Sequence, residues 1–96
     1  MKIFVSEAAD TDLLQIYDYL HQRNPIAAES LMRQIDRKFE SLSRFPFIGR
    51  PREALRPGLR SILACNYVIF YEVADDQVTI VRLLHGRRDI DAEFQR

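Results

Sequence analysis

The chain has 96 residues, of which 14 are basic and 14 acidic, so its formal net charge is zero. This length, together with a 47% share of apolar residues, excludes a disordered chain and indicates a single folded domain over residues 1–96. A protein that binds nucleic acid in general is usually basic as a whole. This chain is neutral, so any contact with nucleic acid would have to be local.

The N-terminal residues predict a strand that leads into a helix. Residues 2–6 are rich in branched and aromatic side chains and end on Ser6, a residue type that caps helices well. Apolar residues then recur at helical spacing from Ala9 to Leu20. Three polar residues fall on the other faces of this helix: Asp12, Gln15 and Asp18.

A second helix is predicted from Asn24 to about Arg44. Asn is a preferred cap, and Pro25 suits the first helical position, where a missing N–H costs nothing. An apolar stripe runs from Ala28 to Leu42. Because so few residues separate the two helices, we expect them to pack as an antiparallel hairpin.

After a long connection, three strands are predicted at residues 59–64, 67–74 and 77–84. The turns between them are about two residues long, so neighbouring strands must run antiparallel and form a meander. A short last helix, residues 90–95, is predicted with Asp89 as its cap. The fold class is therefore α+β, with the sheet position of the first strand left open.

Both faces of the middle strand are apolar. The residues from Tyr67 to Val73 that share one face alternate with Val68 and Phe70 on the other. The helical hairpin covers one face. The other is covered either by a partner segment or by the chain's own tail through Ile90 and Phe94, and we expect the partner.

Taken together, these features resemble the RelE/ParE superfamily of bacterial toxins from type II toxin-antitoxin modules, and in particular its ParE-like branch. The resemblance covers essentially the whole chain and implies a helical hairpin packed on a largely antiparallel sheet. It also implies a cognate, ParD-like antitoxin that wraps and neutralises the toxin. It rests on these motifs: Asn24-Pro25, Phe45-Pro46, Gly49-Arg50, Arg56-Pro57-Gly58-Leu59-Arg60, Tyr67, Phe70-Tyr71 and Leu84-His85-Gly86-Arg87-Arg88-Asp89.

Two activities occur among the proteins that the chain resembles. RelE-like members are ribosome-dependent endonucleases that cut messenger RNA, whereas ParE-like members poison DNA gyrase without a known hydrolytic site. Cleavage of RNA needs proton-transfer groups and fixed positive charge on the phosphate, and Arg60, His85 and Arg88 are the candidates. However, Val68 and Ile62 stand where RelE-like ribonucleases carry a further arginine and a second lysine.

We therefore expect a toxin that inhibits DNA gyrase by binding and has no catalytic residue. Under this hypothesis Arg60, His85, Arg87 and Arg88 contact the target or the antitoxin. The alternative is a ribosome-dependent mRNA endoribonuclease with Arg60, His85 and Arg88 as catalytic residues. A plain structural role for His85, and a solvated turn for the arginines beside it, remain open.

The expected partners are the antitoxin and DNA gyrase, with no membrane and no direct nucleic-acid binding. The sequence has no Gly-rich phosphate loop, zinc-ligand spacing or nucleophile elbow, so we expect no cofactor and no metal. It also has no apolar run long enough to span a bilayer, no secretory signal, and one cysteine, Cys65. These features are typical of a cytoplasmic protein.

Overall fold

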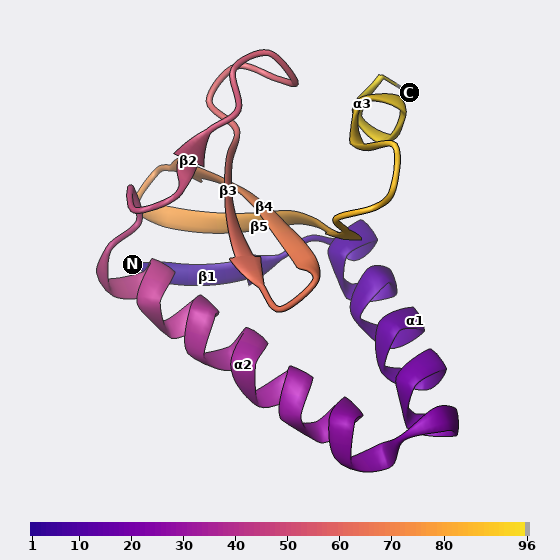
Figure 1. Ribbon diagram of the computed structural model, residues 1–96. Coiled ribbons are helices and arrows are strands. Elements are labelled where there is room, and N and C mark those ends of the chain that lie inside the picture. The colour runs from indigo at the N-terminus through magenta and orange to yellow at the C-terminus, as the bar shows by residue number, and fades with distance from the viewer. Residues whose placement is uncertain (96) are drawn as a thin grey trace.

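The computed structural model describes residues 1–95 and confirms the predicted α+β fold (Figure 1). Two long helices pack on one face of a five-stranded sheet, and a short C-terminal helix lies on the other face. The elements in chain order are β1 (Lys2–Val5), α1 (Glu7–Arg23), α2 (Pro25–Arg44), β2 (Arg50–Pro51), β3 (Arg60–Ala64), β4 (Tyr67–Ala74), β5 (Gln77–His85) and α3 (Ile90–Phe94).

The helix starts follow the predicted caps. The Ser6 side chain accepts a hydrogen bond from the Ala9 N–H, and the Asn24 side chain accepts one from the Ala27 N–H, both at 3.1 Å. Asn24 alone separates α1 from α2, which forces the sharp reversal of the hairpin. None of the helices within residues 1–95 is long and apolar enough to cross a membrane.

The sheet has the strand order β1-β5-β4-β3-β2. Strands β3, β4 and β5 form the predicted antiparallel meander, and β2 adds a two-residue pairing within the long connection. The structure also places β1, whose position the sequence left open, beside β5 in parallel, with Ile3 opposite Val78. Parallel pairing needs a long return, and the helical hairpin with β2, β3 and β4 lies between the two strands in the sequence.

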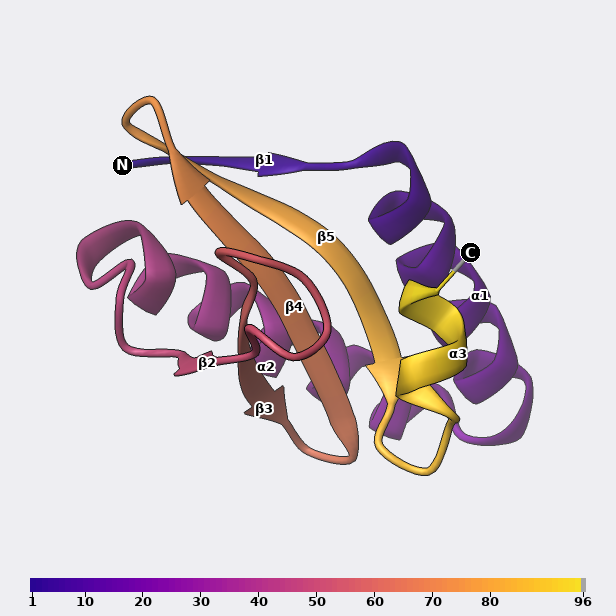
Figure 2. The same cartoon turned by 90° about the horizontal axis from the view of Figure 1, so that it is seen from above.

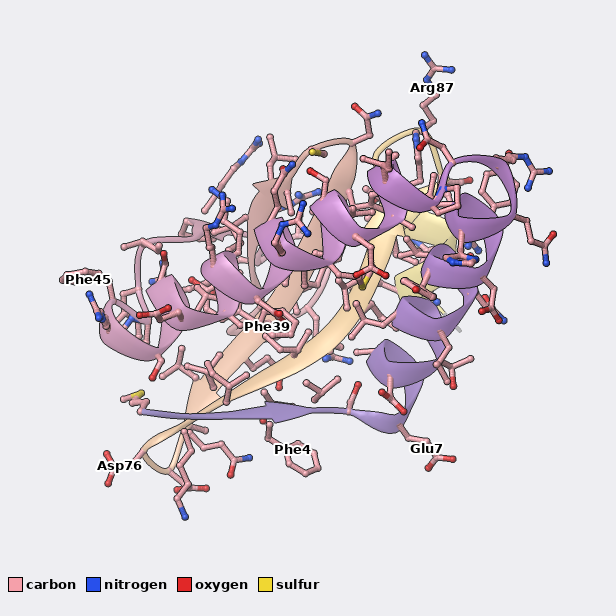
Figure 3. The ribbon with its side chains drawn as sticks, turned by 90° about the horizontal axis from the view of Figure 1, so that it is seen from below. Phe4, Glu7, Phe39, Phe45, Asp76 and Arg87 are labelled. Carbon is pink, nitrogen blue, oxygen red and sulfur yellow. The ribbon has the colours of Figure 1, made fainter. Side chains whose placement is uncertain are left out.

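The main core lies between the hairpin and the sheet. Figure 3 looks onto this helical side, where Phe39 of α2 lies among the side chains between helix and sheet. Each fully buried aliphatic side chain of this layer stabilises the fold by roughly 1.5–3 kcal/mol. The buried residues of this core are Ala9, Leu31, Ile35, Leu42, Ala64, Ile69, Tyr71, Val78, Ile80 and Leu83.

A second apolar cluster fills the opposite face of the sheet, where we expected a partner segment. Figure 2 shows that two segments lie over this face: helix α3, and the connection that leads from α2 into β3. Phe70 is fully buried, and the ring of Phe94 packs edge-on against it with 4.7 Å between centroids. Leu55 and Ile90 complete the cover. The expectation of an uncovered apolar face is therefore wrong, because the chain's own connection and tail occupy it.

Candidate functional site at the end of β5

A hollow of about 360 Å³ lies where the C-terminal end of β5 meets the outer side of α1. It forms because α1 packs beside β5, and because β5 ends at His85 before the turn at Gly86. Its wall combines aromatic, acidic and basic side chains from elements far apart in the sequence. The lining residues are Asp12, Gln15, Ile16, Tyr19, Tyr67, Leu83, His85 and Arg88.

His85 is held in a fixed orientation at the edge of this hollow. It pairs across the sheet with Tyr67, and the two rings meet edge to face with 5.3 Å between centroids. Its Nδ1 accepts a hydrogen bond from the Arg87 N–H at 3.1 Å. In the neutral ring the proton is therefore on Nε2, which can donate to a bound group.

Two tyrosines form the aromatic part of the wall. Burial, with a smaller effect of Tyr19, raises the pKa of the Tyr67 hydroxyl, so this group stays neutral at physiological pH. Tyr19 is 56% exposed, and the Arg23 guanidinium lies 3.7 Å from the centre of its ring. Tyr19 is therefore an exposed aromatic surface with a cation stacked on it.

Asp12 and Arg82 form a buried ion pair beside the hollow that the sequence analysis missed. Asp12, expected on an outer face of its helix, is only 7% exposed. It accepts hydrogen bonds from the Arg82 guanidinium at 2.8 and 3.0 Å and from the Leu83 N–H at 3.0 Å. One sequence signal was available, since Arg82 is the only charged residue within the apolar run of β5.

Glu93 of α3 extends this pair into a network of alternating charges. It bonds Arg82 at 3.3 Å and also pairs with Arg88. Desolvation raises the pKa of Glu93, but its hydrogen bonds and charge interactions with Arg88 and Arg82 outweigh this and hold the pKa below its ordinary value. The hydrogen bond with Asp12 raises the pKa of Arg82. Both arginines beside the hollow are thus paired with carboxylates.

The predicted site residues separate into two groups. His85 at the end of β5 lies next to Arg87 and Arg88 in the turn that follows, with Arg87 extending into solvent (Figure 3). Arg60 lies elsewhere, opposite Tyr71 and thus four residues, or about 13 Å, along the sheet from the His85 pairing.

Arg60 instead supports the connection between α2 and β3. Its guanidinium donates to the carbonyl oxygens of Gly49 at 2.8 Å and Phe47 at 3.2 Å. It also lies over the Phe47 ring, 5.1 Å from the centroid. Through these contacts Arg60 stabilises the connection between α2 and β3. Arg60 does not line the hollow at the end of β5.

Comparison with known families places this geometry in context. The model of the family described as "ParE toxin of type II toxin-antitoxin system, parDE" matches residues 3–90. This chain belongs to the ParE toxin family. It is therefore a ParE-type toxin of a type II toxin-antitoxin system, and the predicted membership of the RelE/ParE superfamily is confirmed.

Individual ParE proteins match over most of their length. The chain is 32% identical to Toxin ParE1 of Mycobacterium tuberculosis over 92 residues, which is 94% of each protein. It is 32% identical to Toxin ParE3 of Caulobacter vibrioides over 84 residues, covering 86% of this chain and 84% of that toxin. Toxin RelE2 of the same organism is 38% identical over 77 residues, covering 80% and 85%.

A solved structure shares the ParE fold. It is titled "Chromosomal ParDE TA system from P. aeruginosa" and aligns with a TM-score of 0.75 over 88% of this chain and 95% of its own. At 23% sequence identity this likeness supports the fold alone.

Proposed function

We propose that this ParE-type toxin inhibits DNA gyrase by binding it and that a cognate ParD-like antitoxin holds it inactive. One observation carries the choice of binding over RNA cleavage. Arg82 and Arg88, which lie beside the hollow, are already paired with Asp12 and Glu93, so the net charge of these four groups is zero.

RNA cleavage requires fixed positive charge at the phosphate, and the paired charges beside the hollow supply little of it. The transition state places extra negative charge on the phosphate, and fixed cations aimed at that charge supply much of the catalysis. A phosphate in the hollow would face the Asp12 carboxylate together with Arg88, whose charge Glu93 already offsets. Arg60, the third cation expected of a ribonuclease site, is bonded to loop carbonyls about 13 Å away along the sheet.

The same surface suits a protein target. Tyrosine and arginine are enriched at the energetic centres of protein interfaces, where large rings and planar guanidinium groups bury area at low entropic cost. Tyr19 is exposed at the hollow, and Arg87 extends from the adjacent turn. Within residues 1–95, no carboxylate pairs with Arg87, so it is available to an acidic partner.

The antitoxin follows from the family and not from the apolar face of the sheet. The matching family is defined by toxin-antitoxin modules, and the solved relative is titled as a ParDE system. Since the tail and the connection already cover the second face, we infer that the antitoxin binds another surface or displaces the tail. Growth arrest by this chain and its relief by the product of a neighbouring gene would test this part.

A second candidate is a ribosome-dependent endoribonuclease that uses His85 and Arg88; of the three residues expected for it, Arg60 does not line the hollow. The orientation of His85 favours it, because its Nε2 is held at the edge of a hollow where it could contact a bound substrate. The similarity to a toxin named RelE2 also supports this second candidate.

Two reactions with the purified protein separate the candidates. The first is supercoiling of relaxed plasmid by gyrase, and the second is translation of a labelled messenger. We expect inhibited supercoiling and an intact messenger. A cleaved messenger with normal supercoiling would replace the first proposal by the second, and His85→Gln should then abolish the cleavage.

A further inference from the structure

Helix α2 carries a polar face that the proposed function does not use. Its members occur at positions i, i+3, i+4, i+7, i+8 and i+11, so they lie on one side of the helix. They line a shallow hollow of about 410 Å³. The residues of this α2 cationic face are Ser30, Arg33, Gln34, Arg37, Lys38 and Ser41.

The three cations of this face have no direct ionic partner in the described part of the chain. Arg33, Arg37 and Lys38 are all exposed. In the region that the structure describes, residues 1–95, none of them forms an ion pair with a carboxylate. All charged residues that line this hollow are therefore basic and free of direct ion pairs with the described residues.

The acidic residues of the same helix do not line this hollow. Glu29, Asp36 and Glu40 follow the adjacent side of α2, three or four residues from Arg33 or Arg37. Glu29 accepts a hydrogen bond from the Tyr17 hydroxyl of α1 at 2.7 Å, and Glu40 pairs with Arg44 at 3.0 Å. The exposed surface of α2 is therefore divided into a basic and an acidic side.

We propose that the α2 cationic face binds the phosphate backbone of duplex DNA without recognising its sequence. Side chains of Arg, Lys, Ser and Gln are the usual partners of DNA phosphate oxygens, and all six members of the face are of these types. The face spans about 16 Å along the helix, at 1.5 Å per residue. Over that length one DNA strand presents about five phosphates.

The composition of the face argues against a peptide partner. Protein interfaces bury an apolar or aromatic anchor at their centre, whereas contacts with phosphate need none. No lining residue of this hollow is apolar. DNA binding here is also independent of His85 and of gyrase, so it adds to the proposed function and does not depend on it.

Counterion release gives the expected size of the effect. If the three cations neutralise three phosphates, the logarithm of the binding constant falls with the logarithm of salt concentration with a slope of about −2.7. Between about 50 and 200 mM salt the affinity then falls roughly 40-fold. Binding by backbone contacts alone should be the same for duplexes of different sequence.

The test measures fluorescence anisotropy of two labelled duplexes of unrelated sequence with three purified proteins. These are the natural chain, the variant Arg33→Gln/Arg37→Gln/Lys38→Gln, and a control variant Lys2→Gln/Arg23→Gln/Arg50→Gln that loses the same charge from other exposed sites. We expect the first variant to lose at least about tenfold in affinity and most of its salt dependence. The control should remain within about twofold, and circular dichroism should show folded protein in all three.

Several outcomes would overturn the proposal. One is the absence of DNA binding by the natural chain at about 50 mM salt, where backbone contacts are strong. Another is an equal loss of affinity in both variants, because binding would then depend on the net charge of the protein and not on the α2 cationic face. A third is that polyglutamate of matched charge competes as well as unlabelled duplex, which would assign the face to an acidic polypeptide.

Discussion

Asp12 of α1 and Arg82 of β5 meet in a two-point ion pair, although 70 residues separate them in the sequence. The Arg82 side chain is 23% exposed and that of Asp12 is 8% exposed. The same carboxylate accepts the Leu83 N–H, so it fastens α1 to the last strand next to His85. The candidate site thus depends on a charged junction inside the domain.

Asp12→Asn should therefore destabilise the protein markedly. The substitution removes the negative charge and leaves the largely buried Arg82 with Glu93 as its remaining partner. Breaking a buried pair in this way costs about 2–4 kcal/mol, which is roughly 10–25 °C in the midpoint of thermal unfolding for a domain of this size. Differential scanning calorimetry measures the shift.

The control for this prediction is Glu40→Gln, which breaks the exposed pair with Arg44. Both side chains of that pair are more than half exposed, so its loss should change stability by less than about 0.5 kcal/mol. Equal melting temperatures for the two variants would show that burial of the Asp12 pair has no energetic consequence.

Gly49→Ala should destabilise the connection between α2 and β3. The Gly49 N–H donates to the Tyr71 hydroxyl at 2.8 Å, and a Cβ at this position would lie 2.6 Å from Cε1 and 2.8 Å from Cζ of the same ring. Tyr71 is fully buried and has no room to retreat. Overpacking of this kind costs about 1–3 kcal/mol, and denaturant titration measures it.

The matched control is Gly86→Ala. A Cβ on Gly86 would have the Asn66 carbonyl oxygen, at 3.4 Å, as its nearest neighbour, which is an ordinary contact. That variant should keep the unfolding midpoint of the natural chain. A Gly49→Ala variant as stable as Gly86→Ala would contradict the tight packing of the loop on Tyr71.

Acid should loosen α3 before the rest of the domain. The folded-state pKa of Glu93 lies below its ordinary value of about 4.3, so its ion pairs contribute fully above that pH and are lost as the pH falls through the lowered pKa. The protection factor of the Ala92 amide, whose N–H is bonded to the Asp89 side chain, should fall over this range once the intrinsic slowing of exchange by acid is corrected for. In Glu93→Gln, exchange there should be fast already at neutral pH, and unchanged exchange in both proteins would refute the role of Glu93.

Phe94→Ala should uncover the second apolar cluster. The Phe94 ring contacts the fully buried Phe70, so its removal should expose apolar surface and bind the dye ANS. Since Phe94 is only partly buried, the expected loss of stability is about 1–2 kcal/mol, below the range for fully buried phenylalanines. Phe4→Ala, which removes a 55% exposed ring from β1, should bind no additional dye.

Arg87→Ala and Arg60→Gln should affect different properties. Arg87 is exposed and unpaired within residues 1–95, so its removal should weaken gyrase inhibition several-fold with an unchanged melting temperature. Arg60 braces the Phe47 and Gly49 carbonyls, so its loss should lower the melting temperature. If Arg87→Ala keeps full inhibition, the turn after β5 is not the target surface.

The local features of the fold were predictable from the sequence. Caps such as Ser6 and Asn24, and two-residue turns between strands, are decided by neighbouring residues, and they gave the helix starts and the antiparallel meander. The predicted last helix, residues 90–95, ends one residue earlier, at Phe94. His85, Arg87 and Arg88 came together because they lie within four residues of one another.

Only the tertiary structure decided what depends on contacts between distant segments. The sequence determined that both faces of the sheet are apolar, but not that the chain's own tail covers the second. It likewise could not show that Arg60 braces a loop, or that Asp12 meets Arg82, because each partner lies on another element. Side-chain pattern fixes which face a residue takes on its own helix or strand, whereas packing between elements fixes what that face meets.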